Sequence, residues 1–481
     1  MAISSPGLGS GLNIQSIVSQ LVAVESQPVK LLQNKGAVLQ TKLSVFGQIK
    51  SELSSMQDAA QSLVDASTWD SKTFTSNNTG AVTGTATSSA LASSFSVEVN
   101  SLASGQSLKT AGVPVGTQVT STGTLTLQTG TWATDGTFTA GSGAAVSIDV
   151  TNGDDLATVA ASINAKKDTT GVTATVVSSN GTQQLLIRGS NTGAAAGFQI
   201  TASTGLEQFG YAAGSVLTPA NGSTPAFYAT VGAMTRTQVA ADASITVDGI
   251  AVTSATNTVA DAIPGVTLNL LAKTTSAAQI SVDVDKAAIK AKIQSFQDAY
   301  NKLNTDLKAQ TKYDSATKTG APLLGDGTTT GLQSMLRSLV ASSGPATSTI
   351  KRLSDLGLQI QADGSLSTNT TKLDAAMQDP NNVKAFFATN SGTAATNGIA
   401  KRIYDFAFGA NGVGGSVSAH SAAFQKSIDQ NNASIDRFNS HIADYQKQLL
   451  AQYTRLDSSM AQLNSLSTFV SQQITTWNKS S

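Results

Sequence analysis

An apolar side chain recurs at every seventh position near the end of this chain. The members of this C-terminal row are Ile428, Ile435, Ile442, Leu449, Leu456, Leu463, Val470 and Trp477. A seven-residue apolar repeat is typical of a coiled coil. At about 1.5 Å per residue it predicts a helix roughly 75 Å long, which exceeds the width of a small domain and needs a partner helix. The alternative is a long amphipathic helix that packs within its own domain.

Polar residues interrupt a second row that runs beside the first. Its apolar members are Phe424, Phe438, Tyr445 and Leu466, and its polar members are Asn431, Gln452 and Ser459. Polar residues at such positions lower the stability of the pair but fix the register of its helices. We therefore expect contacts that are numerous, specific and individually weak.

The beginning of the chain offers a partner helix. An N-terminal row with the same seven-residue spacing consists of Leu32, Leu39, Phe46 and Leu53. Before it, Asn13 is placed to cap a short helix, and Pro28 should bend or stop that helix. The apolar face of the short helix consists of Ile14, Ile17, Val18, Leu21 and Val24.

The middle of the chain has a different character. Residues 73–284 are dominated by Ser, Thr, Gly, Ala and Val, and short alternating runs such as Phe95, Val97 and Val99 predict strands. A chain that starts and ends as a helix should bring its two ends side by side. We expect an α+β multidomain fold, with terminal helices forming a coiled-coil leg and β-rich head domains inserted between them.

Changes in composition along the chain suggest four parts. They are a terminal helical leg, mobile in the monomer, at 1–40 and 430–481; a helical leg domain with a hairpin at 41–78 and 285–429; an inner β-rich head domain at 79–110 and 235–284; and an inserted outer β-rich head domain at 111–234. Pro114 and the Gly/Ala-rich stretch 205–232 mark the limits of the outer domain, and that stretch is expected to be irregular.

The composition excludes several classes of partner. Charged residues make up only 12% of the chain and the net charge is zero, which gives no basic surface for nucleic acid or for a membrane. No apolar run is long enough to predict membrane insertion. The absence of cysteine excludes disulfides and thiolate zinc sites. The first 29 residues contain no Lys or Arg, so the cationic start of a cleaved signal peptide is missing.

The chain offers little catalytic chemistry. Its two histidines, His420 and His441, are expected at solvated positions on the last helix rather than in a metal site or as a base. The glycines Gly7, Gly9 and Gly11 lack the preceding strand and the following Lys of a phosphate-binding loop. We expect no catalytic residue, no metal and no cofactor, and therefore no enzyme.

The amino-terminal segment resembles a known family. Residues 5–22, followed by Glu25 and Pro28, are similar to the amino terminus of the bacterial flagellar filament cap, also called hook-associated protein two. The residues of this motif are Gly7, Leu8, Gly9, Gly11, Leu12, Ile17, Val18, Leu21 and Pro28. Asn13 stands where the family pattern has an acid.

The resemblance continues in order along the chain. Residues 92–106 resemble the first head strand of the family. Residues 154–164 and 171–176 resemble a small module that is common among flagellar axial proteins. Residues 322–327 and 356–373 resemble the carboxyl-terminal half of the family.

The resemblance implies a structural cap at the distal end of the bacterial flagellar filament, outside the cell, exported without a cleaved signal peptide. Five or six copies would form a ring that promotes ordered polymerisation of exported flagellin and prevents its loss, as motility requires. Further implied partners are the hook-filament junction protein and a cytoplasmic export chaperone at the C-terminal helix. The alternative is a surface adhesin that binds glycans through its exposed head; a secreted enzyme is a third hypothesis.

Both rows are expected to carry assembly. If the C-terminal row is loose before assembly, aspartate at Ile442 and Leu449 should stop filament growth and leave the isolated chain almost unchanged, because the charges meet an apolar surface only after assembly.

Overall fold

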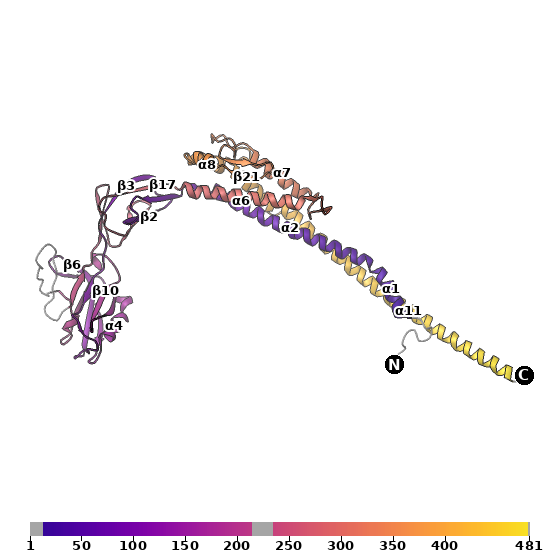
Figure 1. Cartoon of the computed structure of the whole chain (residues 1–481), viewed down its shortest axis with the longest axis horizontal. Helices are drawn as coiled ribbons and strands as arrows, with labels where there is room; N and C mark the ends of the chain where they lie inside the picture. Colours follow the sequence, from indigo (N-terminus) through magenta and orange to yellow (C-terminus); the bar gives the residue numbers. More distant parts are fainter. Residues whose placement is uncertain (1–12, 214–233, 480–481) are drawn as a thin grey trace. The chain divides into compact units, whose positions relative to one another are not determined.

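A computed structural model describes residues 13–213 and 234–479 and divides into two compact units. The helical unit comprises Met1–Trp69 and Lys286–Ser481, and the β-rich unit comprises Asp70–Asp285. The expected α+β multidomain class, with helical ends and a β-rich middle, is confirmed (Figure 1).

The helical unit contains nine helices and two small hairpins in its described residues. The helices are α1 Ile14–Glu25, α2 Gln27–Val64, α3 Ala66–Trp69, α6 Lys286–Thr311, α7 Gly327–Ala341, α8 Thr370–Ala376, α9 Pro380–Ala388, α10 Ile399–Asn411 and α11 Ser416–Lys479. The hairpins join β18 Tyr313–Asp314 to β19 Thr319–Gly320 and β20 Leu358–Ile360 to β21 Leu366–Thr368.

Local sequence sets the ends of the first helices. The side chain of Asn13 accepts a hydrogen bond of 3.0 Å from the Ser16 amide and caps α1. Pro28 lies in the first turn of α2, where its missing N–H costs nothing, so one helix stops and another starts there. The Asn13 amide thus fulfils the capping role that an acid would fill.

Helix α2 supplies the main core of the helical unit. It packs against α6, α10 and α11. Its core residues, each at most 1% exposed, are Phe46, Ile49, Leu53, Met56, Ala60 and Leu63. From α6, the buried Tyr300 hydroxyl donates to the Gly364 carbonyl at 2.9 Å, and burial raises the pKa of this tyrosine to about 12.

The β-rich unit contains two separate hydrophobic cores. The first lies within a five-stranded antiparallel sheet ordered β1 Lys72–Ser76, β17 Ala278–Val284, β3 Ser93–Ser101, β13 Ala243–Val247 and β14 Ile250–Ser254, and a three-stranded sheet of β15 Thr258–Ile263, β16 Val266–Leu270 and β2 Val82–Ala86. At the β13–β14 hairpin, Asp248 and Gly249 have φ values of 46° and 85°, the conformation that a two-residue turn needs.

The second core joins two further sheets to a helix. One sheet contains β12 Thr235–Gln238, β4 Ser107–Lys109, β10 Thr182–Gly189, β5 Val113–Pro114 and β9 Val172–Ser179; the other contains β11 Gly197–Ala202, β6 Gly123–Trp132, β7 Phe138–Ala140 and β8 Val146–Val150. The apolar face of α4 Leu156–Asn164 belongs to this core. Three short elements lie in the same part of the chain: α5 Lys167–Thr170, η1 Ala194–Ala196 and η2 Glu207–Phe209. Phe209 of η2 belongs to the core.

Strand pairing assigns three segments to other parts of the fold than the boundaries expected from composition. Residues 70–78 join the β-rich unit because β1 pairs with β17. Strands β4 and β12 pair with each other, and Leu108 belongs to the second core, so that core begins before 111 and ends after 234. Most of the stretch 205–232 lies outside the described residues, and the four-part division and the mobility of the ends stay predictions.

These pairings make a testable prediction about the outer domain. Residues 105–240 expressed alone should fold, whereas 111–234 should be much less stable because it lacks β4 and β12 and leaves residues 186–188 of β10 unpaired on one edge. Circular dichroism and proton NMR of the two segments test this. If both segments are unfolded, an independent domain is contradicted; if both are equally folded, the role of β4 and β12 is contradicted.

Candidate functional site

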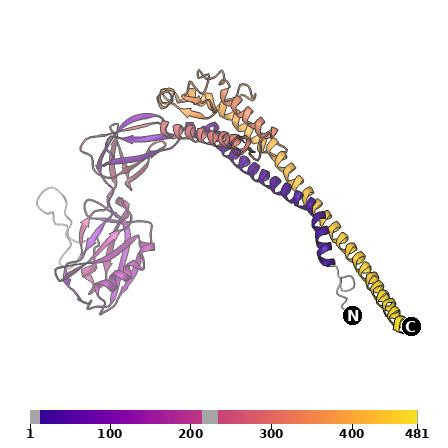
Figure 2. The ribbon, with the colours of Figure 1, turned by 45° about the vertical axis from the view of Figure 1, so that its right-hand side comes forward.

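The two apolar rows meet where α2 and α11 pack antiparallel to each other. The Asn431 side-chain amide of α11 donates to the Leu32 carbonyl of α2 at 2.9 Å. Further along, the Phe46 ring of α2 lies 4.8 Å from the His420 ring and 5.5 Å from the Phe424 ring. Increasing residue numbers on one helix therefore face decreasing numbers on the other (Figures 1 and 2).

Burial of the C-terminal row changes along α11. Ile428 and Leu449 are buried, and Ile435 and Ile442 are half-buried. The later members are exposed, by 47% at Leu456, 59% at Leu463, 47% at Val470 and 76% at Trp477. In the N-terminal row, Phe46 and Leu53 are buried, and Leu32 and Leu39 are half-buried.

The short helix α1 covers one stretch of the C-terminal row. Ile14 and Val18 form a cluster with Leu449, and Val22 and Tyr445 pack against it. This contact corrects the expectation that aspartate at Leu449 leaves the isolated chain unchanged, because Leu449 is already only 8% exposed in a single copy.

The motif residues at the amino terminus fall into two groups. Val18 is buried, Ile17 and Pro28 are half-buried, and Leu21 is 37% exposed. The others, Gly7, Leu8, Gly9, Gly11 and Leu12, lie outside the described residues.

Asn431 and Gly36 form a polar contact within the apolar pairing. Asn431 is 4% exposed, and its side-chain oxygen has no hydrogen-bond partner. A Cβ atom at Gly36 would lie 3.0 Å from the Asn431 amide nitrogen, so the absence of a side chain there leaves room for that amide. The bond to Leu32 can form only in one register of the two helices, because a shift along the apolar row would bury the amide without a partner.

A double-mutant cycle tests this contact. Gly36→Ala should gain about 0.5–1 kcal/mol of helix stability but lose a similar amount by displacing the Asn431 amide. The gain should appear in full in the Asn431→Ala background, which gives a coupling of about 1 kcal/mol in urea unfolding. Additive effects would contradict the contact.

His420 is not the solvated residue that the sequence suggested. Its Nε2 atom lies 2.7 Å from Asp326 Oδ2, and its ring contacts both Phe46 and Phe424. The other oxygen of Asp326 accepts from the Thr329 amide at 2.8 Å and caps α7. These hydrogen bonds hold the pKa of Asp326 below its usual value despite its burial. His420 thus joins α11 to the start of α7 and to α2.

His441 is more exposed and lies at the α1 contact. Its Nδ1 atom is 3.8 Å from Glu25 Oε1, and its side chain is 63% exposed. This residue agrees with the expected solvated position.

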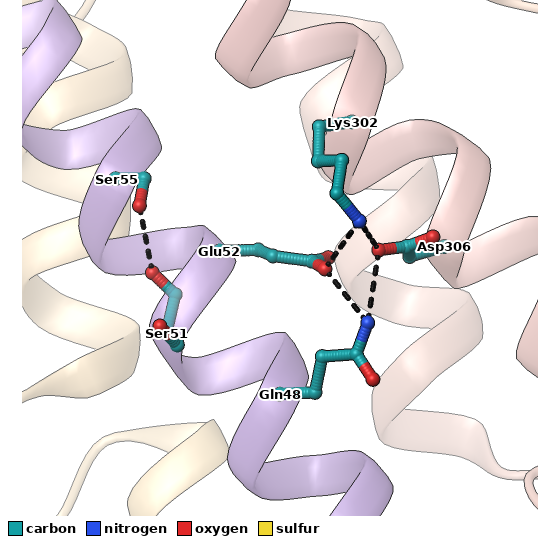
Figure 3. A network of polar contacts seen from close by, with 6 residues as sticks. All are labelled: Gln48, Ser51, Glu52, Ser55, Lys302 and Asp306. Carbon is teal, nitrogen blue, oxygen red and sulfur yellow. Dashed lines mark hydrogen bonds and ion pairs between the residues drawn. The ribbon is translucent and has the colours of Figure 1, made fainter.

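A buried carboxyl pair lies between α2 and α6 (Figure 3). The Glu52 carboxylate accepts from Lys302 Nζ at 3.0 Å and from Gln48 Nε2 at 3.1 Å, and both donors also bond to Asp306. The second Glu52 oxygen is buried without a hydrogen-bond partner. Burial raises the pKa of Glu52, and the hydrogen bond with Glu52 lowers the pKa of Asp306. Of the two carboxyl groups, Glu52 is therefore the one that takes up a proton first as the pH falls.

The pKa of Glu52 predicts the direction of a pH effect. Because its pKa in the folded state lies above the ordinary value of 4.5, the folded chain loses stability as the pH rises from 4.5 through that raised pKa. Glu52→Gln removes the ionisation, so its melting temperature should exceed that of the wild type by a few degrees at neutral pH.

The excess should shrink as the pH falls toward 4.5, and thermal unfolding between pH 4.5 and 8 measures it. Asp58→Asn, an exposed change on the same helix, is the control and should show no such trend. An unchanged difference across this range would contradict the raised pKa of Glu52.

Across 13–213 and 234–479, no group of three or more His, Cys, Asp or Glu residues could hold a metal ion. Over the same residues, no helix is long and apolar enough to cross a membrane. What the helical unit offers instead is an apolar helix surface.

Two family models match opposite ends of the chain. The model described as flagellar hook-associated protein 2 N-terminus matches residues 10–106, and the one described as its C-terminus matches 240–465. Together they cover more than half of the sequence. The chain belongs to the flagellar hook-associated protein 2 family. A third model, the flagellin hook IN motif, matches residues 133–191.

Relatives in this family are similar over almost their full lengths. The A-type flagellar hook-associated protein 2 of Pseudomonas aeruginosa is 30% identical over 479 residues, which cover 96% of this chain and 95% of that protein. The flagellar hook-associated protein 2 of Escherichia coli strain K12 is 28% identical and covers 98% of each chain. A crystal structure of the D1-D2-D3 domains of the flagellar cap protein FliD from Escherichia coli aligns with a TM-score of 0.56 at 26% identity, covering 79% of this chain and 99% of that one.

The two family-model matches cover the N-terminal row in full and the C-terminal row in part. The N-terminal row lies within the first model, and the C-terminal row lies within the second as far as Leu463. Val470 and Trp477 follow the end of that match. The exposed members of the row thus begin inside the matched region and continue past it.

Proposed function

We propose that this chain forms the cap at the distal end of the bacterial flagellar filament. There it promotes the ordered polymerisation of exported flagellin and prevents the loss of flagellin to the medium, and motility requires it. Membership of the hook-associated protein 2 family supports this proposal, as does the similarity to a protein whose structure is described as a flagellar cap.

One observation carries the proposal beyond family membership. The C-terminal row keeps its seven-residue spacing beyond Leu449, the last row residue that α1 covers. Leu456, Leu463 and Val470 are nevertheless about half exposed. In Figures 1 and 2 the last part of α11 extends past α1 with no other described helix beside it. An apolar row of this length in water favours association with another helix. The site residues of both rows are therefore proposed as the assembly surface.

Several partners fit this surface. We propose a ring of five or six copies of the chain, with flagellin and the hook-filament junction protein as the neighbouring components of the filament. Before export, a cytoplasmic chaperone would cover the exposed end of α11. The protein would then act outside the cell after export. No catalytic role is proposed.

The second candidate function is adhesion through the β-rich unit. A polar depression of about 470 Å³ lies on the surface of this unit, beside its second core. Its lining includes Thr129, Asp168, Thr170 and Asn191. Hydroxyl, amide and carboxylate groups of this kind hydrogen-bond to sugars.

A deletion strain separates the two functions. Loss of filaments, with flagellin accumulating in the medium and rescue by the full chain, supports the cap. Normal filaments with poor attachment to glycan-coated surfaces would reject the cap and favour the adhesin. Electron microscopy of the filament tips and immunoblotting of the medium provide the measurements.

A further inference from the structure

The outward side of α2 carries apolar and basic residues, of which Leu31, Lys35 and Val38 are exposed and Lys42 is half-buried. Leu31 is 69% exposed and Val38 is 55% exposed. Lys35 and Lys42, seven residues apart, lie within about 60° of these two residues around the helix at 100° per residue. We call these four residues the α2 outer face. Neither lysine forms an ion pair with any described residue.

The outward side of α11 carries the opposite charge at the same spacing. Asp429 and Asp436 are exposed, seven residues apart, and neither is in an ion pair within the described chain. Ala422, Ala433 and Ala443 lie within about 50° of them and are also exposed. We call these five residues the α11 outer face. It is flat and acidic, whereas the α2 outer face projects apolar side chains and is basic.

The two outer faces lie on opposite sides of the α2–α11 pair. On α2, the outer face lies about 40–120° from the direction of Leu32 and Leu39, toward lower angles. On α11, the outer face lies about 120° from the direction of the buried row residues, toward higher angles. Because the helices are antiparallel, these two rotations lead to opposite sides of the plane that contains both axes.

We propose that the α2 outer face of one copy of this chain binds the α11 outer face of a second copy. Lys35 and Lys42 would pair with Asp429 and Asp436, and Leu31 and Val38 would pack against the alanines. The inference rests on the proposed ring and identifies the surfaces that close it.

Symmetry supports a second copy as the occupant. Each copy offers one basic and one acidic face on opposite sides, so contacts run from head to tail, and such contacts form a ring when the rotation between copies closes. Neighbouring charges favour the same pairing. No acid lies in residues 27–51 of α2, and Lys426 and Arg437 of α11 point about 60–100° away from the aspartates. Lys447 lies on the aspartate side, about three turns further along.

Charge reversal in the full chain tests the interface. The variants are Lys35→Glu with Lys42→Glu, Asp429→Lys with Asp436→Lys, and all four changes together. Each pair should weaken self-association at least about tenfold in sedimentation velocity, and the fourfold variant should return to within about threefold of the wild type because opposite charges face each other again. Lys292→Glu with Lys312→Glu, at exposed positions away from both faces, changes the net charge as much as the first pair does, and should leave association within about threefold.

Cross-linking gives a second measurement that does not depend on charge. The chain contains no cysteine. Two full-length variants, Val38→Cys and Ala433→Cys, mixed and oxidised, should therefore yield a disulfide-linked mixed dimer. His441→Cys, exposed on the other side of α11, is the control partner and should yield little.

The outcomes separate this interface from the ring itself. If the wild type oligomerises but the reversals have no effect, or the fourfold variant is no better than the single pairs, the interface is wrong and the ring survives. Equal cross-linking to both partner positions would also overturn the interface. A wild-type chain that stays monomeric at every concentration, and shows no ring at filament tips, overturns both proposals.

Discussion

Replacing Leu463 and Val470 with aspartate is expected to abolish filament growth and to leave the isolated chain folded. Both side chains are about half exposed in one copy, so the substitutions should move its melting temperature by no more than about 1 °C. In the assembled cap the two carboxylates would be buried in an apolar contact without a partner, which costs several kcal/mol. Swimming assays and the amount of flagellin in the medium measure the result.

A matched control lies on the same helix. Ser465→Asp with Gln472→Asp places two charges, also seven residues apart, on the opposite side of α11, and both residues are exposed. This variant should swim normally. If it fails equally, added charge alone explains the defect. If the Leu463 and Val470 variant swims normally, the exposed row is not the assembly surface.

Replacing Phe46 with alanine is expected to produce the largest loss of stability. Phe46 is fully buried, and its ring contacts both His420 and Phe424 of α11. Truncating a buried phenylalanine typically costs about 3–5 kcal/mol, through lost burial and the cavity that remains. Because this contact joins α2 to α11, the helical unit should unfold earlier in urea, while the signal of the β-rich unit changes little.

Exposed residues on the same helix provide the comparison. Leu31→Ala and Val38→Ala should each change stability by less than about 0.5 kcal/mol, because these side chains are mostly in solvent in a single copy. A Phe46→Ala chain as stable as these two would show that α2 and α11 are not held together at this position.

The architecture of the helical unit could be predicted from the sequence because its signals are local. The seven-residue rows, the cap at Asn13 and the break at Pro28 each act within a few residues of their own position. The two-residue turn at Asp248 and Gly249 is local as well. Such features depend on backbone geometry that neighbouring residues set.

The burial of individual row residues could not be predicted in the same way. Leu449 and Leu456 are both leucines in the same row, but one is 8% exposed and the other 47%. What distinguishes them is α1, a helix from the other end of the sequence. Ile14 and Val18 of its first half pack on Leu449, and α1 does not extend as far as Leu456. A repeat identifies which side of a helix is apolar but not how much of it a partner covers.

The polar contacts were missed for a related reason. His420 and Asp326 are 94 residues apart, and Glu52 and Lys302 are 250 apart, so no local pattern links them. Gln48 and Glu52, four residues apart on a helix with an apolar face, gave the only sequence signal that a polar group lies near the core. Their partners emerge only from the packing of α2 against α6.

Helix α11 is unbroken from Ser416 to Lys479, so one rigid element carries both ends of the interaction. Its first part holds the His420 contact, and its last part, beyond Leu456, extends for about 35 Å as a lever arm. No loop separates the two parts, so a force applied near Val470 is carried along the helix toward its first part. It reaches the aromatic contacts around Phe46 as torque. If the proposed assembly holds the end of α11, a movement there would be felt in the interior of the helical unit.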